Sequence, residues 1–540
     1  MKHLIIPGSI VLSVLAAACD RISLDPIRGD GAGGATGEGG DGGGGGSTGS
    51  GGGNAGSGTA GGGTAGSGNA GSGTAGSGIT GSATTGSATT GSGGGAPSTG
   101  DALWSRHFGA NAGEPHLSEG HIAVDGAGHV ILATQVADGV DFGDGPLSIE
   151  GSLAFALAKF DGEGALLWDK QFSDSSSVRD VAVTPAGLIA TTGSTQGSSV
   201  DFGGGPLVGQ EDRRDAFVAV FTADGDHVWS TRIGADSDQY ADHVAVDAAG
   251  NVVVAGFFLD QISLCGASLT SAAQADSYIA KFDPAGNCLW SKQFGYTEIH
   301  NVALDASGSV VLAGSFGDYF TETIDLGGGP LTTAGHEDIF VAKLDADGEH
   351  LWSKRFGDAA IQRAYGVAVD GSGDVVVSGT FQGTVDFGGG PLVSSGGFGP
   401  LGPDSVTWGG NAFVTKLNPE GELLWTRRLG QDGPQTALDV ATVGGDIAIT
   451  GLMYGDVDLG TGLMKCTYGD AFVAKIDATG TVRWVKHTGD RGDQYGRSTA
   501  MDGAGNVFAA GPFMGTIDFG TGPLLNPRSA GDIFLVKLGP

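Results

Sequence analysis

The chain has few basic residues and, after its first twenty residues, no long apolar segment. Its 540 residues include only 27 Lys or Arg against 60 Asp or Glu, which gives a formal net charge of −33. A chain this acidic has little positive charge to place against phosphates, so a nucleic-acid-binding function is excluded. Without an internal apolar run of membrane-spanning length, membrane contact is expected only at the N-terminus.

Cysteine is also scarce, and recognisable catalytic motifs are missing. The four cysteines are Cys19, Cys265, Cys288 and Cys466, and no C-x-x-C motif or His–Cys cluster accompanies them, so we expect no zinc site. Cys265 and Cys288 fall in one repeat, where they either pair as a disulfide or serve as small buried apolar residues. No G-x-S-x-G, H-E-x-x-H, P-loop or EF-hand pattern is present. We therefore predict neither an enzymatic activity nor a cofactor.

The acidic residues are mostly Asp, with 48 Asp against 12 Glu. Asp is a turn residue because its short side chain accepts hydrogen bonds from nearby backbone N–H groups. Most of the negative charge is therefore expected in turns, and binding of Ca²⁺ by some of these carboxylates is the alternative.

The N-terminus has the pattern of a targeting segment. Residues 1–18 are predicted to be a signal peptide, with Lys2 followed by an apolar stretch from Leu4 to Leu15. The sequence "LAAAC" resembles the lipobox of bacterial lipoproteins, which implies a lipid on Cys19, although Ala16 stands where a large aliphatic residue is usual. The alternative is ordinary signal-peptidase cleavage and secretion. We expect an exported protein, lipid-anchored to the bacterial envelope at the outer membrane or cell surface.

Residues 19–100 form the predicted lipidated N-terminus and tether. From Gly29 onward the segment is almost only Gly, Ser, Thr and Ala. Such a composition cannot bury enough apolar surface to offset its ordering entropy, so we expect a disordered linker.

After residue 100 the sequence repeats. Seven tryptophans recur at spacings of 64, 61, 61, 62, 73 and 59 residues, at Trp104, Trp168, Trp229, Trp290, Trp352, Trp425 and Trp484. A Gly stands four residues before each of the last six, in turns such as "DADG". The apolar runs between turns are short and rich in Val and aromatic residues, which indicates buried strands rather than helices.

The repeat predicts a β-propeller over residues 101–540. Each unit reads as two hairpins, hence a four-stranded antiparallel blade, and such blades stack around an axis. The first unit begins at its last strand, "LWSRHF", and the final unit ends after its third, "DIFLVKL". The two fragments complete one blade, so we predict seven blades in a ring closed by the N-terminal strand. The repeat tryptophans are expected to pack between blades, with Lys343 and Asp345 at strand edges.

The motif "FVAKLD", then "LWSK" and "VAVD" with "GNVVVAG", resembles the bacterial SBBP β-propeller repeat of secreted and surface proteins. The resemblance covers residues 101–540 and implies a seven-bladed propeller without an assigned chemistry.

Function is expected where the repeats differ. One such position comes just before the predicted innermost strand and is occupied, in blades one to seven, by His121, Asp180, His243, Asn301, Gly366, Asp439 and Ser498. We expect these residues to ring the channel mouth, where two His with nearby Asp suit a transition metal or an anion. The alternative is a hydrated channel lined by polar residues.

The second difference is an insertion in blade five, Ser394 to Asn411, which holds Phe398 and Trp408. Aromatic residues on long loops commonly anchor partners, so this is a candidate binding loop; the alternative is a loop that folds back and buries its Trp.

Together these features predict a monomeric, non-catalytic surface scaffold that binds a protein or glycan. The alternative is a secreted propeller enzyme, a lyase, hydrolase or oxidoreductase, with its site at the channel mouth.

Overall fold

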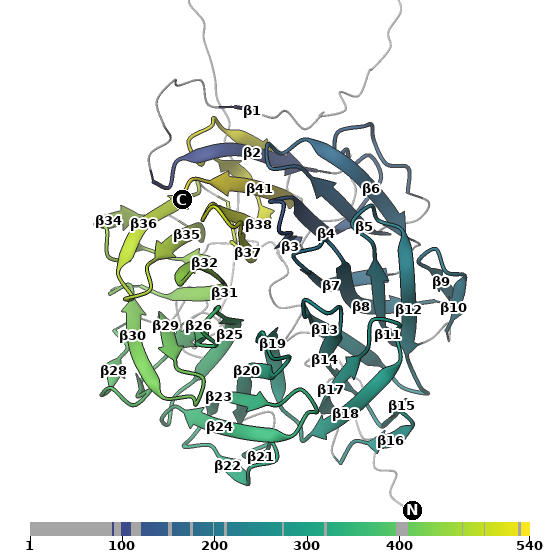
Figure 1. Cartoon of the computed structure of the whole chain (residues 1–540). Coiled ribbons are helices and arrows are strands. Elements are labelled where there is room, and N and C mark those ends of the chain that lie inside the picture. Colours follow the sequence, from purple (N-terminus) through teal and green to yellow (C-terminus); the bar gives the residue numbers. More distant parts are fainter. Residues whose placement is uncertain are drawn as a thin grey trace, which may run out of the picture. The chain divides into compact units, whose positions relative to one another are not determined.

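The computed structural model describes residues 89–90, 99–109, 120–149, 154–172, 176–197, 199–209, 213–272, 275–317, 321–395, 409–431, 433–466, 468–490, 492–526 and 531–540. Within these residues all regular structure is β-strand, and seven blades surround a central axis (Figure 1). The predicted signal peptide, Cys19 and nearly all of the predicted tether lie outside the described residues. No helix in the described ranges is both long and apolar enough to cross a membrane.

Each blade is an antiparallel sheet whose strands run in order from the channel to the outside. The innermost strands are β3 (Gly120–Val124), β7 (Ser176–Val183), β13 (Gln239–Val246), β19 (Glu298–Leu304), β25 (Gln362–Val369), β31 (Gln435–Val443) and β37 (Ser498–Met501). The second strands are β4 (Val130–Val136), β8 (Ile189–Gln196), β14 (Val252–Phe258), β20 (Val310–Gly317), β26 (Val375–Phe381), β32 (Asp446–Met453) and β38 (Val507–Phe513).

The third strands hold the repeated "FVAKLD" segment. They are β5 (Ala154–Phe160), β11 (Arg214–Phe221), β17 (Asp276–Phe282), β23 (Glu337–Leu344), β29 (Asn411–Leu417), β35 (Asp470–Ile476) and β41 (Asp532–Leu538). The outer strands are β6 (Leu166–Phe172), β12 (His227–Ile233), β18 (Cys288–Phe294), β24 (His350–Phe356), β30 (Leu423–Leu429), β36 (Val482–Thr488) and β2 (Ala102–Phe108).

Within the described residues, six blades add a small two-stranded hairpin between the second and third strands, built around "DFGGGPL", a close variant of it or, in blade three, "SLCGASL". The hairpins are β9 (Ser199–Asp201) with β10 (Pro206–Val208), β15 (Gln261–Leu264) with β16 (Ala267–Thr270), β21 (Thr323–Asp325) with β22 (Pro330–Thr332), β27 (Thr384–Val385) with β28 (Leu392–Val393), β33 (Asp456–Asp458) with β34 (Leu463–Lys465), and β39 (Gly515–Ile517) with β40 (Leu524–Asn526).

The ring closes as the sequence predicts. Strand β2, the first of the propeller in the chain, pairs antiparallel with β41, the last, and completes the seventh blade. Two residues of the predicted tether, β1 (Thr89–Thr90), add to the free edge of β2. Pairing the two ends of the ring removes the exposed sheet edge that an open array of blades would leave.

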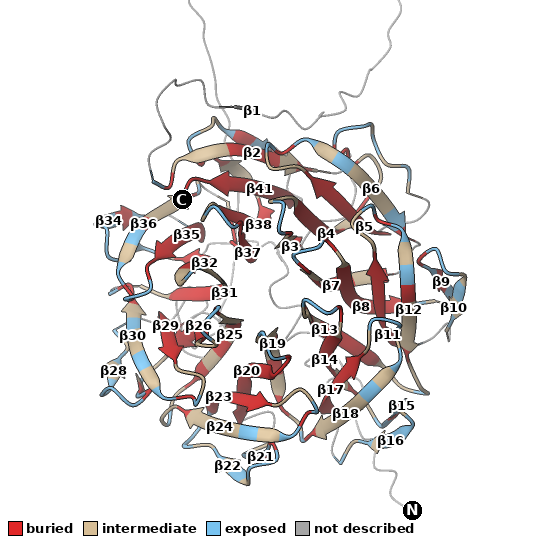
Figure 2. Ribbon diagram, viewed as in Figure 1, coloured by how far each residue is buried: buried red, intermediate tan, exposed pale blue. Residues whose placement is uncertain are grey.

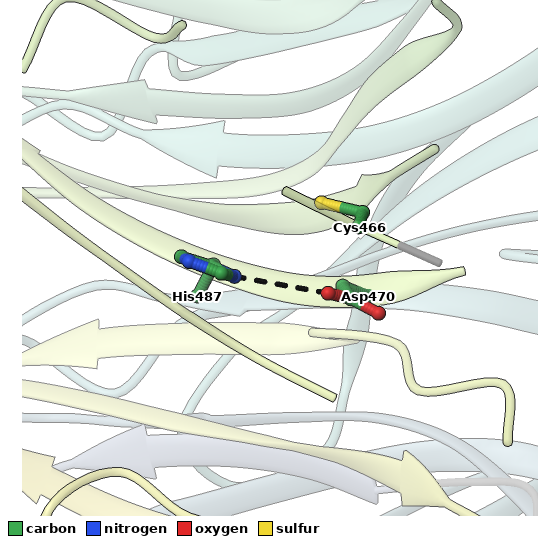
Figure 3. Close-up of side chains that lie close together, drawn as sticks. All are labelled: Cys466, Asp470 and His487. Atoms are coloured by element: carbon green, nitrogen blue, oxygen red, sulfur yellow. Dashed lines mark ion pairs between the residues drawn. The ribbon is translucent and has the colours of Figure 1, made fainter. Parts of the chain in front are cut away.

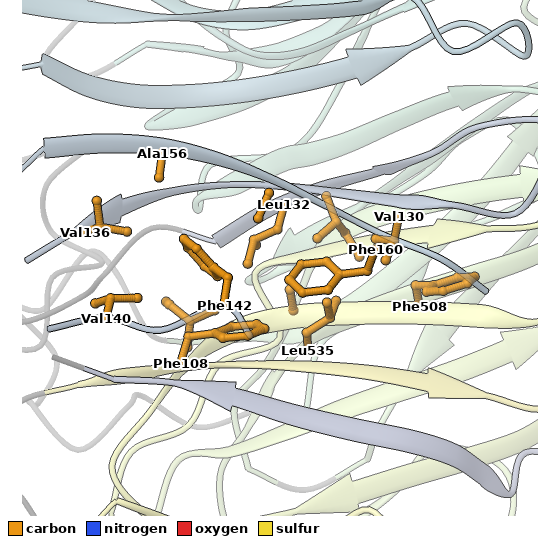
Figure 4. Packing of buried hydrophobic residues seen from close by; sticks show 14 of the residues in the cluster. Phe108, Val130, Leu132, Val136, Val140, Phe142, Ala156, Phe160, Phe508 and Leu535 are labelled. Carbon is orange, nitrogen blue, oxygen red and sulfur yellow. The ribbon is translucent and has the colours of Figure 1, made fainter. Parts of the chain in front are cut away.

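The hydrophobic core lies between neighbouring blades. Figure 4 shows one such layer, in which Phe142 and Phe160 of blade one meet Phe108, Phe508 and Leu535 of blade seven. The inner three strands of each blade are mostly buried, whereas the outer strands other than β2 consist mostly of intermediate residues with one or two exposed ones (Figure 2). Each blade buries both faces of its inner strands against its two neighbours.

The repeat tryptophans clamp adjacent blades, as predicted. The indole N–H of Trp352 donates to the carbonyl of Pro419 in the next blade at 2.8 Å, and four other repeat tryptophans bond the matching turn in the same way. A Cβ on the turn glycine Gly421 would lie 3.0 Å from the Trp352 ring, so only Gly fits beneath the indole. Gly100, which the sequence analysis assigns to the tether, takes the same place under Trp484 and gives the ring its seventh clamp.

The expectation that Lys343 stays at a strand edge is wrong. Its side chain is buried, and Nζ lies 2.9 Å from Oδ2 of Asp305, a turn residue of the same blade. The equivalent pairs are Lys159–Asp125, Lys416–Asp370 and Lys537–Asp502, at 2.7–3.2 Å. In blade two both partners are replaced, by Val220 and Thr184. In blade three Lys281 is equally buried but donates to the carbonyls of Gly308 and Ala346 instead of pairing with a carboxylate. A buried lysine needs a partner for its charge, and in most blades that partner is the turn Asp.

Candidate functional site

The predicted channel residues lie inside the innermost strands, not before them, so the expected position is corrected by a few residues. Asp180, His243, Asn301, Gly366 and Asp439 each sit at a β-bulge, where one residue of the inner strand has no partner on the second strand. A bulge re-aims the side chains beside it and increases the local twist. His121 and Ser498 occupy the matching places in β3 and β37.

Several of these side chains join one blade to the next. The carboxylate of Asp180 accepts the N–H of Val181 at 2.8 Å and, in blade three, that of Val244 at 3.0 Å. Asp439 likewise accepts the N–H of Val440 and, in blade seven, that of Thr499, both at 2.8 Å. These carboxylates therefore hold the inner strands together around the channel.

The linkage continues across the closure of the ring. Ser498 Oγ donates to Asp439 Oδ2 and accepts the N–H of Ile122 in blade one, each at 3.2 Å. In blade five the same position is Gly366, where a Cβ would lie 3.0 Å from the backbone nitrogen of Val440 in blade six, leaving no room for a side chain. Much of the predicted ring is therefore structural as well as accessible from the channel.

The structure brings His121, Asp180 and His243 together from three consecutive blades. Asp180 Oδ1 lies 3.9 Å from His121 Nδ1, and Oδ2 lies 3.8 Å from His243 Nδ1. Burial raises the pKa of Asp180 to about 7, against the opposing effect of its backbone hydrogen bonds and with a further contribution from the charge of Asp439. Burial, together with the nearby His300 and Arg497, holds the pKa of His243 well below its usual range.

A second set of channel residues was missed by the sequence analysis. Each directly precedes one of the predicted positions, and the set comprises Arg179, Asp242, His300, Tyr365, Leu438 and Arg497. At a bulge two successive side chains face the same side, so both line the channel, whereas in a regular strand every second residue would. Aligning one position per blade could not reveal them, but the dipeptides "RD", "DH", "HN" and "RS" carried the signal.

Together the two sets, apart from Gly366, line a cavity of about 100 Å³ at the channel. A side cavity of about 40 Å³ continues from it past Asp242, His243 and His300 to Glu298. His300 Nε2 lies 3.0 Å from Ser315 Oγ and 3.4 Å from Glu298 Oε2. Burial raises the pKa of Glu298 to about 7 and lowers the pKa of His300 to about 3.

The cavity therefore mixes fixed positive charge with neutral donors and acceptors. Arg179 and Arg497 line it together with Asp180, Asp242 and Asp439, and the ring of His300 lies 5.1 Å from that of Tyr365. Typical small-molecule sites enclose about 300–1,000 Å³, so this cavity suits one polar group of a larger ligand rather than a whole cofactor.

In the described part of the chain, the ring residues do not provide three donor atoms close enough together to hold one metal ion, so nothing in the geometry supports their predicted transition-metal role. The one group of three His, Cys, Asp or Glu residues found there with all donor atoms within 4.8 Å is elsewhere, in blade six. The candidate loop residues Phe398 and Trp408 lie outside the described residues, as does Cys19, so their predicted roles stay predictions.

Cys265 and Cys288 form a disulfide that joins β18 to the turn of the β15–β16 hairpin, with a Cα–Cα distance of 5.1 Å. The sequence had left this pairing and two buried thiols as equal alternatives.

Asp residues form the turns, as expected from their excess. The Oδ1 of Asp345, for instance, accepts the N–H groups of Asp347 and Glu349 at 2.9 and 2.8 Å. The same two bonds recur at Asp125, Asp161, Asp247, Asp283, Asp305, Asp370, Asp477 and Asp502. These carboxylates serve the backbone, and Ca²⁺ binding by them stays an untested expectation.

Comparison with known proteins gives only distant likenesses. No family model matches the chain. An uncharacterized WD repeat-containing protein of Acanthamoeba polyphaga mimivirus is 28% identical over 110 residues, which are 18% of this chain and 8% of that protein. The regulatory protein FlaEY of Caulobacter vibrioides is 26% identical over 182 residues, 33% of this chain and 18% of that protein. The chain thus spans less than a fifth of the length of these curated relatives.

Among solved structures, the β-propeller domain of the trilobed protease from Pyrococcus furiosus has a TM-score of 0.36 at 9% identity, covering 77% of this chain and 99% of that one. A protein of unknown function from Dyadobacter fermentans has a TM-score of 0.38 at 10% identity, covering 81% and 98%. The polysaccharide lyase Uly1 has a TM-score of 0.38 at 11% identity, covering 80% and 91%. Likenesses this distant carry no argument about function.

Proposed function

We propose that this protein is a non-catalytic binding protein whose channel mouth holds one polar unit of an extracellular glycan. The observation that carries the proposal is the channel cavity, in which Arg179 and Arg497 stand among His, Asp and Tyr side chains from different blades. Sugar hydroxyls donate and accept hydrogen bonds at once, so a glycan unit needs such an interleaved lining. A protein terminus is the other ligand class consistent with the scaffold.

The inner strands favour rigid binding over chemistry. Asp180, Asp439 and Ser498 are engaged by backbone N–H groups of neighbouring blades, which fixes the shape of the mouth. A preformed site loses little conformational entropy when a ligand binds.

A secreted propeller enzyme is the second candidate, and one observation favours it. Asp180 lies within 4 Å of two His, and its pKa of about 7 suits a general acid or base at neutral pH. Perturbed pKa values gather at catalytic sites, although structural carboxylates show them too.

We further propose that the chain is an exported, monomeric lipoprotein of the SBBP repeat family, anchored to the envelope through Cys19 and held out on its Gly-rich tether. The apolar N-terminus, the "LAAAC" sequence and the repeated "FVAKLD" and "LWSK" motifs support this. Metabolic labelling with a fatty acid tests it: wild type should incorporate the label and Cys19→Ala should not. Equal labelling of both would place the lipid elsewhere, and no labelling would favour secretion.

The binding proposal is tested by probing the full chain against an array of bacterial envelope oligosaccharides. Arg179→Gln and Arg497→Gln should each weaken binding of the best array ligand by at least about tenfold, the effect of losing one charge-assisted hydrogen bond. Arg483→Gln, on the outer strand β36 and largely exposed, is the matched control and should bind as wild type. Mass spectrometry of the ligand after long incubation separates the two candidates, because an enzyme would convert it.

A further inference from the structure

Blade six holds a Cys–Asp–His cluster outside the channel site. Cys466 follows β34, Asp470 begins β35 and His487 lies on β36, and their donor atoms are all within 4.8 Å of one another. Figure 3 shows the three side chains, with the 3.7 Å contact between His487 Nδ1 and Asp470 Oδ2 dashed.

Two polar atoms of the cluster are buried without a hydrogen-bond partner. They are Oδ1 of Asp470, whose side chain is 4% exposed, and Nδ1 of His487. Oε1 of Gln494 is a third buried oxygen without a partner, and it faces the same space: a Cβ at Gly489 would lie 2.4 Å from both Asp470 Oδ1 and Gln494 Oε1. The Oδ1 atoms of the equivalent Asp276 and Asp338 are unpartnered as well, so the atom that sets blade six apart is Nδ1 of His487, buried 3.7 Å from the carboxylate without a hydrogen bond. Buried polar atoms are nearly always paired, so this nitrogen beside an unpartnered carboxylate oxygen points to a missing partner.

Two other blades show a different partner at the same place. In blade four, Arg355 pairs with Phe340 across the strands and forms an ion pair with Asp338. Blade two repeats the arrangement with Arg232 and Asp215. In blade six the equivalent residue, paired with Phe472, is His487, so Asp470 lacks the guanidinium that Asp215 and Asp338 have. Blade three has Gln293 at this place, bonded to Asp276, and blade seven has His107.

The thiol is specific to the same blade. By register, Cys466 stands one residue after the hairpin pair Asp456–Lys465, where blade four has Thr333 after Thr323–Thr332. Cys466 is a buried free cysteine, and it points a sulfur donor toward the carboxylate. Blade six therefore has an imidazole where blades two and four have a guanidinium, and it has a thiol at the same place.

We propose that Cys466, Asp470 and His487 bind a divalent transition metal ion, zinc in particular, with the fourth position open to water. Sulfur, carboxylate oxygen and imidazole nitrogen together are the donor set that zinc takes, and three protein ligands plus water is the arrangement of its open sites. The ion supplies the positive charge that Arg355 and Arg232 supply elsewhere. The unpartnered Gln494 Oε1 is an acceptor for the metal-bound water.

The geometry requires only a small contraction. Ligand atoms around tetrahedral zinc stand roughly 3.3–3.8 Å apart, from bond lengths of about 2.0–2.3 Å. The three donors, now within 4.8 Å, reach this by a shift of about 1 Å in side chains. His487, at 32% side-chain exposure, gives the ion a path from solvent.

The test is titration of the chelator-treated full chain with Co²⁺, a spectroscopic substitute for zinc, followed by displacement with Zn²⁺. Wild type should bind one ion per chain and show a thiolate-to-cobalt charge-transfer band that disappears on adding zinc. Cys466→Ser should lose that band, and His487→Gln should lower the bound zinc to background. Binding without the thiolate band, or unchanged zinc content in both variants, overturns the proposal.

The matched control is the blade-four sequence transplanted into blade six, Cys466→Thr with His487→Arg. It restores the Arg–Asp ion pair, so it should fold with an unchanged melting temperature in chelator while binding no cobalt at this site. Zinc should raise the melting temperature of wild type and leave that of the double variant unchanged; an equal rise in both would locate the metal elsewhere.

Discussion

Replacing either Lys343 or Asp305 alone should destabilise the propeller, whereas replacing the two together by Val and Thr should not. The two side chains are 7% and 10% exposed and meet at 2.9 Å, so each single change leaves a buried charge unpaired. Breaking a buried pair from one side costs about 3–5 kcal/mol, whereas replacing both partners by neutral residues of similar size is often neutral. Blade two already carries such a replacement, with Val220 and Thr184.

The two single variants should differ. Asp305→Thr leaves the ammonium of Lys343 buried, and we expect the full cost of about 3–5 kcal/mol. Lys343→Val leaves Asp305 still accepting the N–H groups of Ser307 and Ser309 at 2.9 Å, so the cost should fall toward about 2 kcal/mol. In the double variant a Thr at 305 can cap the turn as Thr184 does, whose Oγ1 accepts the N–H of Leu188 at 3.0 Å.

The assay is urea unfolding of the four proteins at pH 7, followed by tryptophan fluorescence. The double variant should lie within about 1 kcal/mol of wild type, giving a favourable interaction energy of several kcal/mol in the double-mutant cycle. A double variant as unstable as the sum of the two singles would refute the reasoning, because the pair would then not be one unit. Hydrogen bonding and the Lys343 charge lower the pKa of Asp305 to about 2 despite burial, so its contribution should persist above pH 4 and disappear between about pH 4 and 2.

Three further predictions concern other parts of the ring. Gly421→Ala, at φ +78° beneath an indole, should lower the free energy of unfolding in urea by about 2–4 kcal/mol. Gly266→Ala, at φ +77° in open space, should lower it only by the backbone strain of about 1 kcal/mol. Equal losses in the two variants would contradict the role of Trp352 and Gly421 as a clamp. Reducing the Cys265–Cys288 disulfide, which closes a separation of 23 residues, should lower the stability by about 3 kcal/mol, and no change in urea midpoint with reductant would count against it. Burial raises the pKa of Asp180 to about 7, so between about pH 4 and 7 the folded protein holds a proton that the unfolded chain has lost. The free energy of unfolding should therefore fall as the pH rises from about 4 to 7, and Asp180→Asn should remove that part of the fall. An Asp180→Asn variant with the same pH profile as wild type would contradict this.

Repetition made the fold predictable. The period of the tryptophans marks the blades, and the incomplete first and last units predict that β2 closes the ring on β41. These features depend on local turns and on a spacing that can be read along the chain. Gly100 escaped notice only because it ends a segment full of glycine.

The site was less predictable because its geometry depends on local irregularity. His121, Asp180 and His243 could be found by aligning equivalent positions, and the structure places the carboxylate of Asp180 within 4 Å of both imidazole rings. Arg179 could not, because a bulge in β7 places two successive residues at the channel, and neither could Arg497, which lines the channel from the residue just before β37.

Contacts between residues far apart in the sequence were the other feature that could not be predicted. Lys343 finds Asp305 across two strands of its blade, and a periodic lysine gives no sign of its burial. Cys466 and His487 are equally unconnected by any short motif, and only the comparison with the other blades singles them out.

The most direct test of the proposed function is calorimetric titration of the full chain, and of its Arg497→Gln variant, with the best ligand from the oligosaccharide array. We predict one binding site per chain, at least about tenfold weaker binding by the variant, and a ligand recovered unchanged after incubation. Equal affinity of the two proteins would contradict binding at the channel mouth, and conversion of the ligand by wild type would make the protein an enzyme.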